Sequence, residues 1–237
     1  MSLPKLHYPI FELEVPSVKK NLKFRPFLVK EEKLLLTAQQ TGEIKEIVLA
    51  LKQIINNCIV EGQSFDIETL TLFDIEFLFL KLRAKSVNNV VDITVIDKED
   101  EKEYKLKVDL EEVKIINNPE HINNVDVGNN INIKLRYPKV DLIDKIQMMA
   151  ANVEMFFEVI KYCIEEVKQG DVVYKLSDYS DQEVEEFVQQ INVEGFNKVT
   201  KFFDTMPKMY YEIKYTNSNE KEQIIKLETL ADFFTLA

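Results

Sequence analysis

The hydrophobic period of this chain changes repeatedly between helical spacing and strand-like alternation, and this feature constrains the fold most. Alternation of apolar and polar residues, which is typical of half-buried strands, is found at 10–16, 22–29, 90–97, 103–110, 113–117, 131–138, 172–176, 209–216 and 221–228. Apolar residues at three- and four-residue steps, which are typical of amphipathic helices, are found at 31–40, 41–59, 65–84, 140–168, 180–191 and 193–205. The sequence therefore predicts an α+β fold, with a helical core, N-terminal and C-terminal hairpins and a β-rich middle.

The β-rich middle also indicates a domain organisation. The strand-like runs between residues 88 and 137 separate two parts of the chain that contain the predicted helices. We expect residues 88–137 to form an inserted β-rich subdomain, and residues 1–87 and 138–237 to form the main α+β domain.

Local signals mark the ends of several predicted helices. Thr71 followed by Asp74 is typical of a capping box at a helix start. Thr41 or Gly42 is expected near the start of the second helix. The apolar spacing over 140–168 has no break, so it predicts one continuous helix, about 40 Å long at 1.5 Å per residue.

The charge and cysteine content exclude several classes of partner. Lys and Arg number 30 against 41 Asp and Glu, so the formal net charge is −11. Nucleic-acid binding depends on clustered cations that neutralise phosphates, so we expect no nucleic-acid partner. No run approaches the ~18–20 apolar residues of a spanning helix, so we expect no membrane partner. Cys58 and Cys163 lie in apolar helical patterns, which predicts no disulfide and a reducing, cytoplasmic location.

The residues that usually hold cofactors or metals are sparse. The five glycines are isolated, which excludes a phosphate-binding loop, and two Cys with two distant His cannot form a zinc site. The carboxylates from Asp97 to Glu103 lack the glycine and the spacing of a calcium-binding EF-hand, so we expect a solvated hairpin tip there. The sequence predicts no catalytic residue, no cofactor and no metal.

Two segments are candidates for a protein interface. Phe24, Arg25 and Phe27 lie at a predicted sheet edge, and Arg and aromatic residues dominate interface energetics. The alternative is that the two Phe side chains belong to the core and that Arg25 covers it. At the C-terminal end, the apolar residues either dock on their own domain or contact a partner; the candidates there are Leu230, Phe233 and Phe234.

Three segments together resemble the T4-like bacteriophage baseplate hub family. They are FELEVPSVKKNLKFRPFLVKEEKLLLTA (11–38), FDIEFLFLKLRAKSV (73–87) and YYEIKYTNSNEKEQIIKLETLADFF (210–234). FRPFLVKEEK and FLKLRAKSV are the most specific pieces. Some relatives carry a cysteine pair in the β-rich middle, whereas residues 88–137 contain no cysteine, so a metal site is not carried over to this chain.

The resemblance implies a non-enzymatic protein that acts in assembly of the central baseplate hub as a hub subunit. Its partners would be other hub proteins. The protein would meet them in the host cytoplasm and be retained with them in the virion tail. A transient assembly chaperone is the alternative within this family. An alternative of another class is a carboxylate-dependent hydrolase, for which Asp74 and Glu76, set in an apolar run, are the only candidates. The simpler interpretation of those two carboxylates is helix N-terminal charge. The sequence leaves the oligomeric state open.

Overall fold

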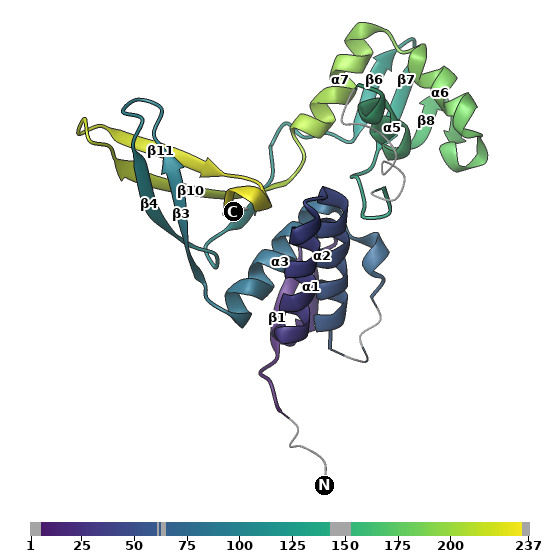
Figure 1. Cartoon of the computed structure of the whole chain (residues 1–237). Helices are drawn as coiled ribbons and strands as arrows, with labels where there is room; N and C mark the ends of the chain where they lie inside the picture. Colours follow the sequence, from purple (N-terminus) through teal and green to yellow (C-terminus); the bar gives the residue numbers. More distant parts are fainter. Residues whose placement is uncertain (1–5, 61, 63–64, 143–152, 234–237) are drawn as a thin grey trace. The chain divides into compact units, whose positions relative to one another are not determined.

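The computed structural model describes residues 6–60, 62, 65–142 and 153–233, and it has the mixed α+β architecture that the sequence predicts (Figure 1). The helices are α1 (Val29–Thr41), α2 (Ile44–Cys58), α3 (Leu72–Ser86), α5 (Val153–Cys163), α6 (Asp181–Gln189), α7 (Val193–Asp204) and α8 (Leu230–Phe233). The strands are β1 (Phe11–Val15), β2 (Lys20–Phe24), β3 (Val90–Ile96), β4 (Glu103–Asp109), β5 (Lys114–Ile116), β6 (Asn124–Gly128), β7 (Ile131–Leu135), β8 (Ile164–Gln169), β9 (Val172–Lys175), β10 (Lys208–Thr216) and β11 (Glu222–Leu227).

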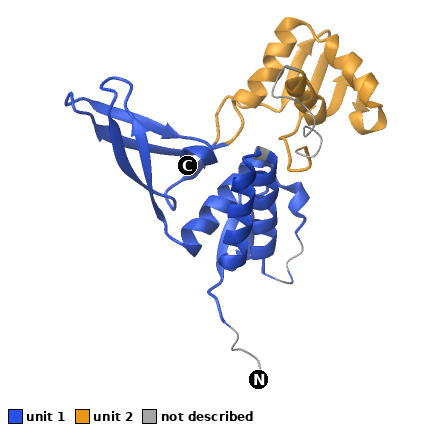
Figure 2. Ribbon diagram, in the orientation of Figure 1, with its two compact units in different colours: residues 1–116, 208–237 blue, residues 117–207 orange. Residues whose placement is uncertain are grey.

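The chain divides into two units (Figure 2): unit 1 comprises residues 1–116 and 208–237, and unit 2 comprises residues 117–207. This division differs from the predicted insertion at 88–137. The reason is that β5 pairs with β10, with Ile115 opposite Met209, which joins the segment before residue 117 to the C-terminal hairpin. The inserted unit therefore begins and ends later in the chain than the hydrophobic period alone indicates.

The N-terminal part of unit 1 is a hairpin packed with three helices. β1 and β2 pair antiparallel, with Leu13 opposite Leu22, and β1 packs against α3, which in turn packs against α2. The predicted capping box of Thr71 and Asp74 is confirmed at the start of α3. Gly42 lies two residues before the start of α2, as expected, and it also ends α1: its φ of 69° is left-handed, and its N–H donates to the Gln39 carbonyl.

The rest of unit 1 is built from two antiparallel β elements and α3. β3 pairs with β4, and β10 lies between β11 and β5 in a second sheet. One apolar cluster joins these strands to α3 and α8; its buried members include Leu80, Ala84, Ile93, Val108, Met209, Leu227 and Phe233. Residues from the middle and from the end of the chain thus share one core.

Unit 2 is a four-stranded antiparallel sheet with helices on one face. The strand order is β6-β7-β8-β9, and β6 is an element that the sequence pattern did not reveal. Side chains of β6, β7 and β8 form one buried cluster with residues of α5, α6 and α7. Lys134, Glu166 and Lys168 alternate with these core residues, so they lie on the opposite, polar face.

The predicted continuous helix over 140–168 is wrong at its C-terminal end, and residues 143–152 lie outside the described residues. α5 ends at Cys163, and β8 starts at the next residue. A bulge in β8 explains why the apolar spacing in this strand resembles that of a helix. Lys134 pairs with Glu166 and Leu135 with Ile164, so one extra residue lies in β8, and residues three apart, Ile164 and Val167, both reach the core. A three-residue apolar step therefore arises here within a strand.

Unit 2 also contains a close approach of helix to strand. A Cβ atom built on Gly195, in the first turn of α7, would lie 2.9 Å from both the Cβ and the carbonyl oxygen of Val127 in β6. Glycine is required at this point because any side chain would overlap the strand backbone.

Candidate interaction surfaces

Arg25 is held inside unit 1 by a buried carboxylate. Its Nη2 lies 2.9 Å from Oε1 of Glu31, its Nη1 lies 3.3 Å from Oε2, and Nη2 also donates to the Asn57 carbonyl at 2.8 Å. Glu31 is 1% exposed and also accepts from the Leu28 N–H at 2.9 Å. Burial acts to raise the pKa of Glu31, but the hydrogen bonds from Arg25 and Leu28 outweigh it and hold the pKa below its ordinary value. Glu31 is therefore a buried, ionised carboxylate with Arg25 as its counter-ion.

The predicted interface at residues 22–29 is largely inside the protein. Phe24 is fully buried and its ring lies 6.5 Å from that of Phe11, while Phe27 is 7% exposed and stacks on Phe79 at 6.3 Å. The strand also ends at Phe24, so residues 25–28 form no sheet edge. This burial matches the alternative in which both Phe side chains belong to the core and Arg25 covers that core.

The C-terminal candidates dock on their own unit. Phe233 is 1% exposed and Leu230 is half-buried, and both pack in the apolar cluster around Leu80 of α3. Phe234 lies outside the described residues. α8 is capped by Asp232, whose carboxylate accepts from the N–H and the hydroxyl of Thr229. Of the two possibilities for this end of the chain, the described residues match docking.

Of the two carboxylates in the apolar run, Asp74 has a structural partner at each oxygen. Its Oδ1 accepts from the Ser17 N–H at 2.9 Å, and its Oδ2 accepts from the N–H and the hydroxyl of Thr71 at 2.9 and 2.7 Å. Glu76, two residues further along α3, lies against α8. Burial raises the pKa of Glu76 to about 7, although the Leu230 N–H, which donates to it, acts in the other direction, and the nearby charge of Asp232 adds to the rise.

Glu76→Gln is expected to stabilise the protein at alkaline pH. The pKa of Glu76 rises from an ordinary 4.5 to about 7, so the stability that its proton supplies is present below pH 4.5 and is lost as the pH rises through 7. Gln keeps the acceptor for Leu230 without the charge. At pH 8 the free energy of unfolding of the variant is therefore expected to exceed that of the unmodified chain by about 1–2 kcal/mol. Urea unfolding from pH 5 to pH 9 measures the difference. The exposed Glu112→Gln is the matched control, and a gain that does not vary with pH would contradict the buried charge.

The carboxylates at the β3–β4 turn form a latch with the β10–β11 turn and are not a solvated tip. Asp97 is 3% exposed and accepts from the Tyr215 hydroxyl at 2.6 Å. Asp100 accepts from the Tyr104 hydroxyl at 2.6 Å, and from the N–H and hydroxyl of Ser218 at 3.0 and 2.7 Å. The two tyrosine rings lie 4.9 Å apart. Residues more than a hundred positions apart in the sequence therefore join two hairpin turns, which we call the hairpin latch.

Glu99 completes the hairpin latch from the same turn. Its oxygens accept from the side chains of Asn217, Lys221 and Gln223. The hydrogen bond from Tyr215 holds the pKa of Asp97 below its ordinary value, and the one from Lys221 does so for Glu99. Because both pKa values are lowered, the latch is complete above about pH 4, where free carboxylates ionise, and is lost as the pH falls through the lowered values. Glu101 and Glu103 of the same segment are exposed, as expected.

Tyr215→Phe is expected to open the hairpin latch locally without unfolding unit 1. The variant leaves Asp97 without its side-chain donor, so amide hydrogen exchange over residues 217–223 is expected to rise about tenfold. Hydrogen-exchange mass spectrometry measures the rate. Tyr210→Phe is the matched control, since the Tyr210 hydroxyl donates to Glu212 within the same strand. Equal exchange in both variants would show that the latch does not hold the turns together.

Residues that commonly bind metals are dispersed or buried. Burial raises the pKa of Cys58 to about 11 and that of Cys163 to about 12, so both thiols are protonated at neutral pH. His121 donates to or accepts from Thr205 at 2.9 Å and stacks on Tyr137. Among the described residues, no group of three or more His, Cys, Asp or Glu could hold a metal ion.

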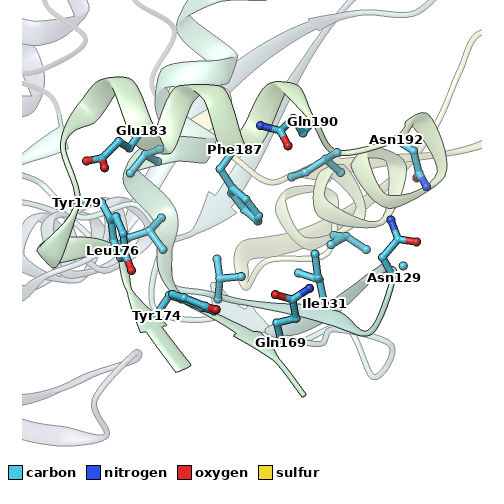
Figure 3. Close-up of a pocket in the computed structure, with 15 residues that line it drawn as sticks. Asn129, Ile131, Gln169, Tyr174, Leu176, Tyr179, Glu183, Phe187, Gln190 and Asn192 are labelled. Atoms are coloured by element: carbon cyan, nitrogen blue, oxygen red, sulfur yellow. The ribbon is translucent and has the colours of Figure 1, made fainter. Parts of the chain in front are cut away.

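A groove with a cavity volume of about 450 Å³ lies in unit 2 between the sheet and α6 (Figure 3). Its floor includes Ile131 and Tyr174, and Phe187 projects from α6 toward that floor. Amide side chains, of which Asn129 and Gln169 are examples, lie at one end. Sequence reasoning missed this site because strands and helix contribute to it from four separate segments.

No helix in the described part of the chain is long and apolar enough to cross a membrane.

Comparison with known proteins identifies the family of this chain. Neither the curated proteins nor the solved structures contain a match to the sequence or the fold. A family model described as T4 bacteriophage base plate protein matches residues 8–235, a span that includes nearly all of unit 1 and the whole of unit 2. The chain therefore belongs to the T4 bacteriophage base plate protein family.

Proposed function

We propose that this protein acts in assembly of the central hub of the phage baseplate, as a non-enzymatic hub subunit. The observation that carries the proposal is the family match, which continues through both units from residue 8 to residue 235. The match covers most of the chain and includes residues of both units. Its partners would be other baseplate proteins, which it would meet in the host cytoplasm and accompany into the virion tail.

The structural use of the carboxylates supports a non-enzymatic role. A carboxylate-dependent hydrolase needs two carboxyl groups that face a substrate across a cleft. Asp74 accepts three hydrogen bonds at a helix start, and the carboxylates of the hairpin latch accept from the β10–β11 turn. These groups are engaged in holding elements together.

A transient assembly chaperone is the second candidate, and one observation favours it. Each unit buries an apolar core of its own, as expected of a protein that persists alone before and after it meets a partner. A retained subunit, in contrast, is expected to bury large apolar interfaces.

Quantitative mass spectrometry of purified particles tests the proposal. The protein is co-expressed with the baseplate proteins that are encoded beside it. Finished baseplates are then separated from precursor complexes by size-exclusion chromatography. A fixed ratio to known baseplate subunits in finished particles is the expected result. Presence in precursors alone would establish the chaperone role, and absence from both fractions would overturn the hub proposal.

A further inference from the structure

The groove of unit 2 is an uncovered end of the apolar sheet face. Ile131 and Val167 on its floor are followed along the same strands by residues of the buried cluster, and Val184 and Phe187 of α6 form one wall. A volume of about 450 Å³ falls within the range of ligand-binding pockets, roughly 300–1,000 Å³. The groove is thus large enough to take side chains from another molecule.

The groove opens beside a strand that has a free edge. β9 pairs with β8 and with no other described strand, so its outer N–H and C=O groups lack a sheet neighbour. Val172 and Val173 of β9 are 52% and 49% exposed. Tyr174 pairs with Val167 and Val172 with Gln169, so Val172 and Tyr174 lie on the groove side of the sheet. An extended segment added to β9 would continue the sheet and place alternate side chains toward the groove.

Unused polar groups lie at the groove. The side-chain amides of Asn129 and Gln169 make no hydrogen bond with another residue that the structure describes, and the same holds for the hydroxyls of Tyr174 and Tyr179. Amide and hydroxyl groups both donate and accept, so they can bond a polypeptide backbone of any sequence.

The chain segment that forms one wall of the groove is acidic, although Glu183 is the one carboxylate among the described residues that line the groove. Residues 176–192, which include the 3₁₀ turn Leu176–Asp178 and α6, contain five carboxylates and no Lys or Arg. Glu183 lines the groove itself. The opposite face of the sheet carries Lys168 and Lys175, which would repel cations there. A second copy of this chain, with a net charge of −11, is a poor match for this wall.

We propose that the groove binds an extended segment of a partner protein, in which an apolar residue is flanked by Lys or Arg on the same side of the strand. The segment pairs with the free edge of β9, the apolar side chain enters the groove between the sheet and α6, and the cations face the carboxylates of residues 176–192. The inference is independent of the hub assignment, because it depends only on the geometry and charge of unit 2.

Fluorescence anisotropy with the full chain and a labelled peptide KTKTLTKTK tests the proposal. In a strand, Leu and the four Lys of this peptide share one side and Thr occupies the other. We expect a dissociation constant on the order of 10–100 μM, which weakens as salt is added. Peptides KTKTGTKTK, without the apolar side chain, and KTKTLPKTK, without one backbone N–H, are expected to bind at least about fivefold more weakly. The charge-reversed ETETLTETE is expected not to bind.

Variants of the full chain place the binding at the groove. Gln169→Arg adds a cation on the groove side of β8 and is expected to weaken binding about tenfold, while Glu183→Gln, which keeps the acceptor for Ser180, weakens it about threefold. Glu194→Gln, an exposed carboxylate in α7 outside the groove, is the matched control and is expected to bind as the unmodified chain does. Equal binding of the Pro or Gly peptide, or full binding by the Gln169→Arg variant, would indicate charge attraction alone and would overturn the proposal. Peptide-free self-association that Gln169→Arg abolishes would instead assign the groove to a second copy and equally overturn it.

Discussion

Arg25→Ala is expected to lower the free energy of unfolding of unit 1 by about 3–5 kcal/mol, the usual cost of removing one partner of a buried ion pair. Glu31 has a side chain with no solvent exposure, and Arg25 supplies two of its hydrogen bonds. Without the guanidinium, the carboxylate must remain charged without its buried partner or take up a proton. Lys30 also lies 3.5 Å from Glu31, but its side chain is 66% exposed, so it compensates only in part.

Urea unfolding at pH 7 measures the effect of the Arg25 variant, and two further variants control it. Arg25→Lys keeps the charge but loses the bidentate hydrogen bonding to Glu31. It is therefore expected to lose less stability than Arg25→Ala. Arg25→Ala combined with Glu31→Gln removes the buried charge and keeps an acceptor for the Leu28 N–H, so it is expected to recover part of the loss. A loss below about 1 kcal/mol for Arg25→Ala would show that the ion pair is not needed for stability, and Arg25 would again be a candidate for partner binding.

Gly195→Ala is expected to destabilise unit 2 by about 3 kcal/mol, although alanine is the better helix former by about 1 kcal/mol. The added Cβ would lie 2.9 Å from the carbonyl oxygen and 3.0 Å from the Cα of Val127. These are backbone atoms of β6, so relief requires α7 to move away from the sheet and from its buried contacts at Val199 and Phe202.

Thermal and urea unfolding measure the effect of the Gly195 variant. Asn197→Ala, at an exposed position of the same helix, is the matched control and is expected to change stability by less than about 0.5 kcal/mol. Because residue 195 lies at the start of α7, the N-cap bond from its N–H to Asn192 is kept in the Ala variant. Stability equal to or above that of the unmodified chain would show that helix and strand are not in close contact.

The capping and hairpin predictions succeeded because their determinants are local. Thr71 and Asp74 are three residues apart and bond each other at the start of α3. The C-terminal hairpin forms between alternating segments that a short turn joins, with Ile213 opposite Ile225. In such cases the interacting groups are neighbours in the sequence, so residue type and spacing are sufficient.

The candidate site residues depended on contacts that no local pattern contains. From the sequence, Arg25 could contact a partner or cover the core. In the structure it donates to Glu31 in α1 and to the Asn57 carbonyl at the end of α2, so it belongs to the core. Asp97 has the composition of a solvated turn, but Tyr215, 118 positions away, binds it. Burial and charge pairing of this kind depend on which elements meet, and that is set by the whole chain.

The sequence by itself determined the fold class, the positions of most helices and strands, the helix cap at Thr71 and the family of the chain. Only the tertiary structure decided that Ile164 begins a strand, since the bulge opposite Lys134 allows a helical apolar step within a sheet. It also decided the boundaries of unit 2, through the pairing of β5 with β10, and it formed the groove from separate strands and α6. The physical reason is that hydrophobic period and caps act between residues a few positions apart. Strand partners, bulges and grooves arise between residues that the folded chain brings together.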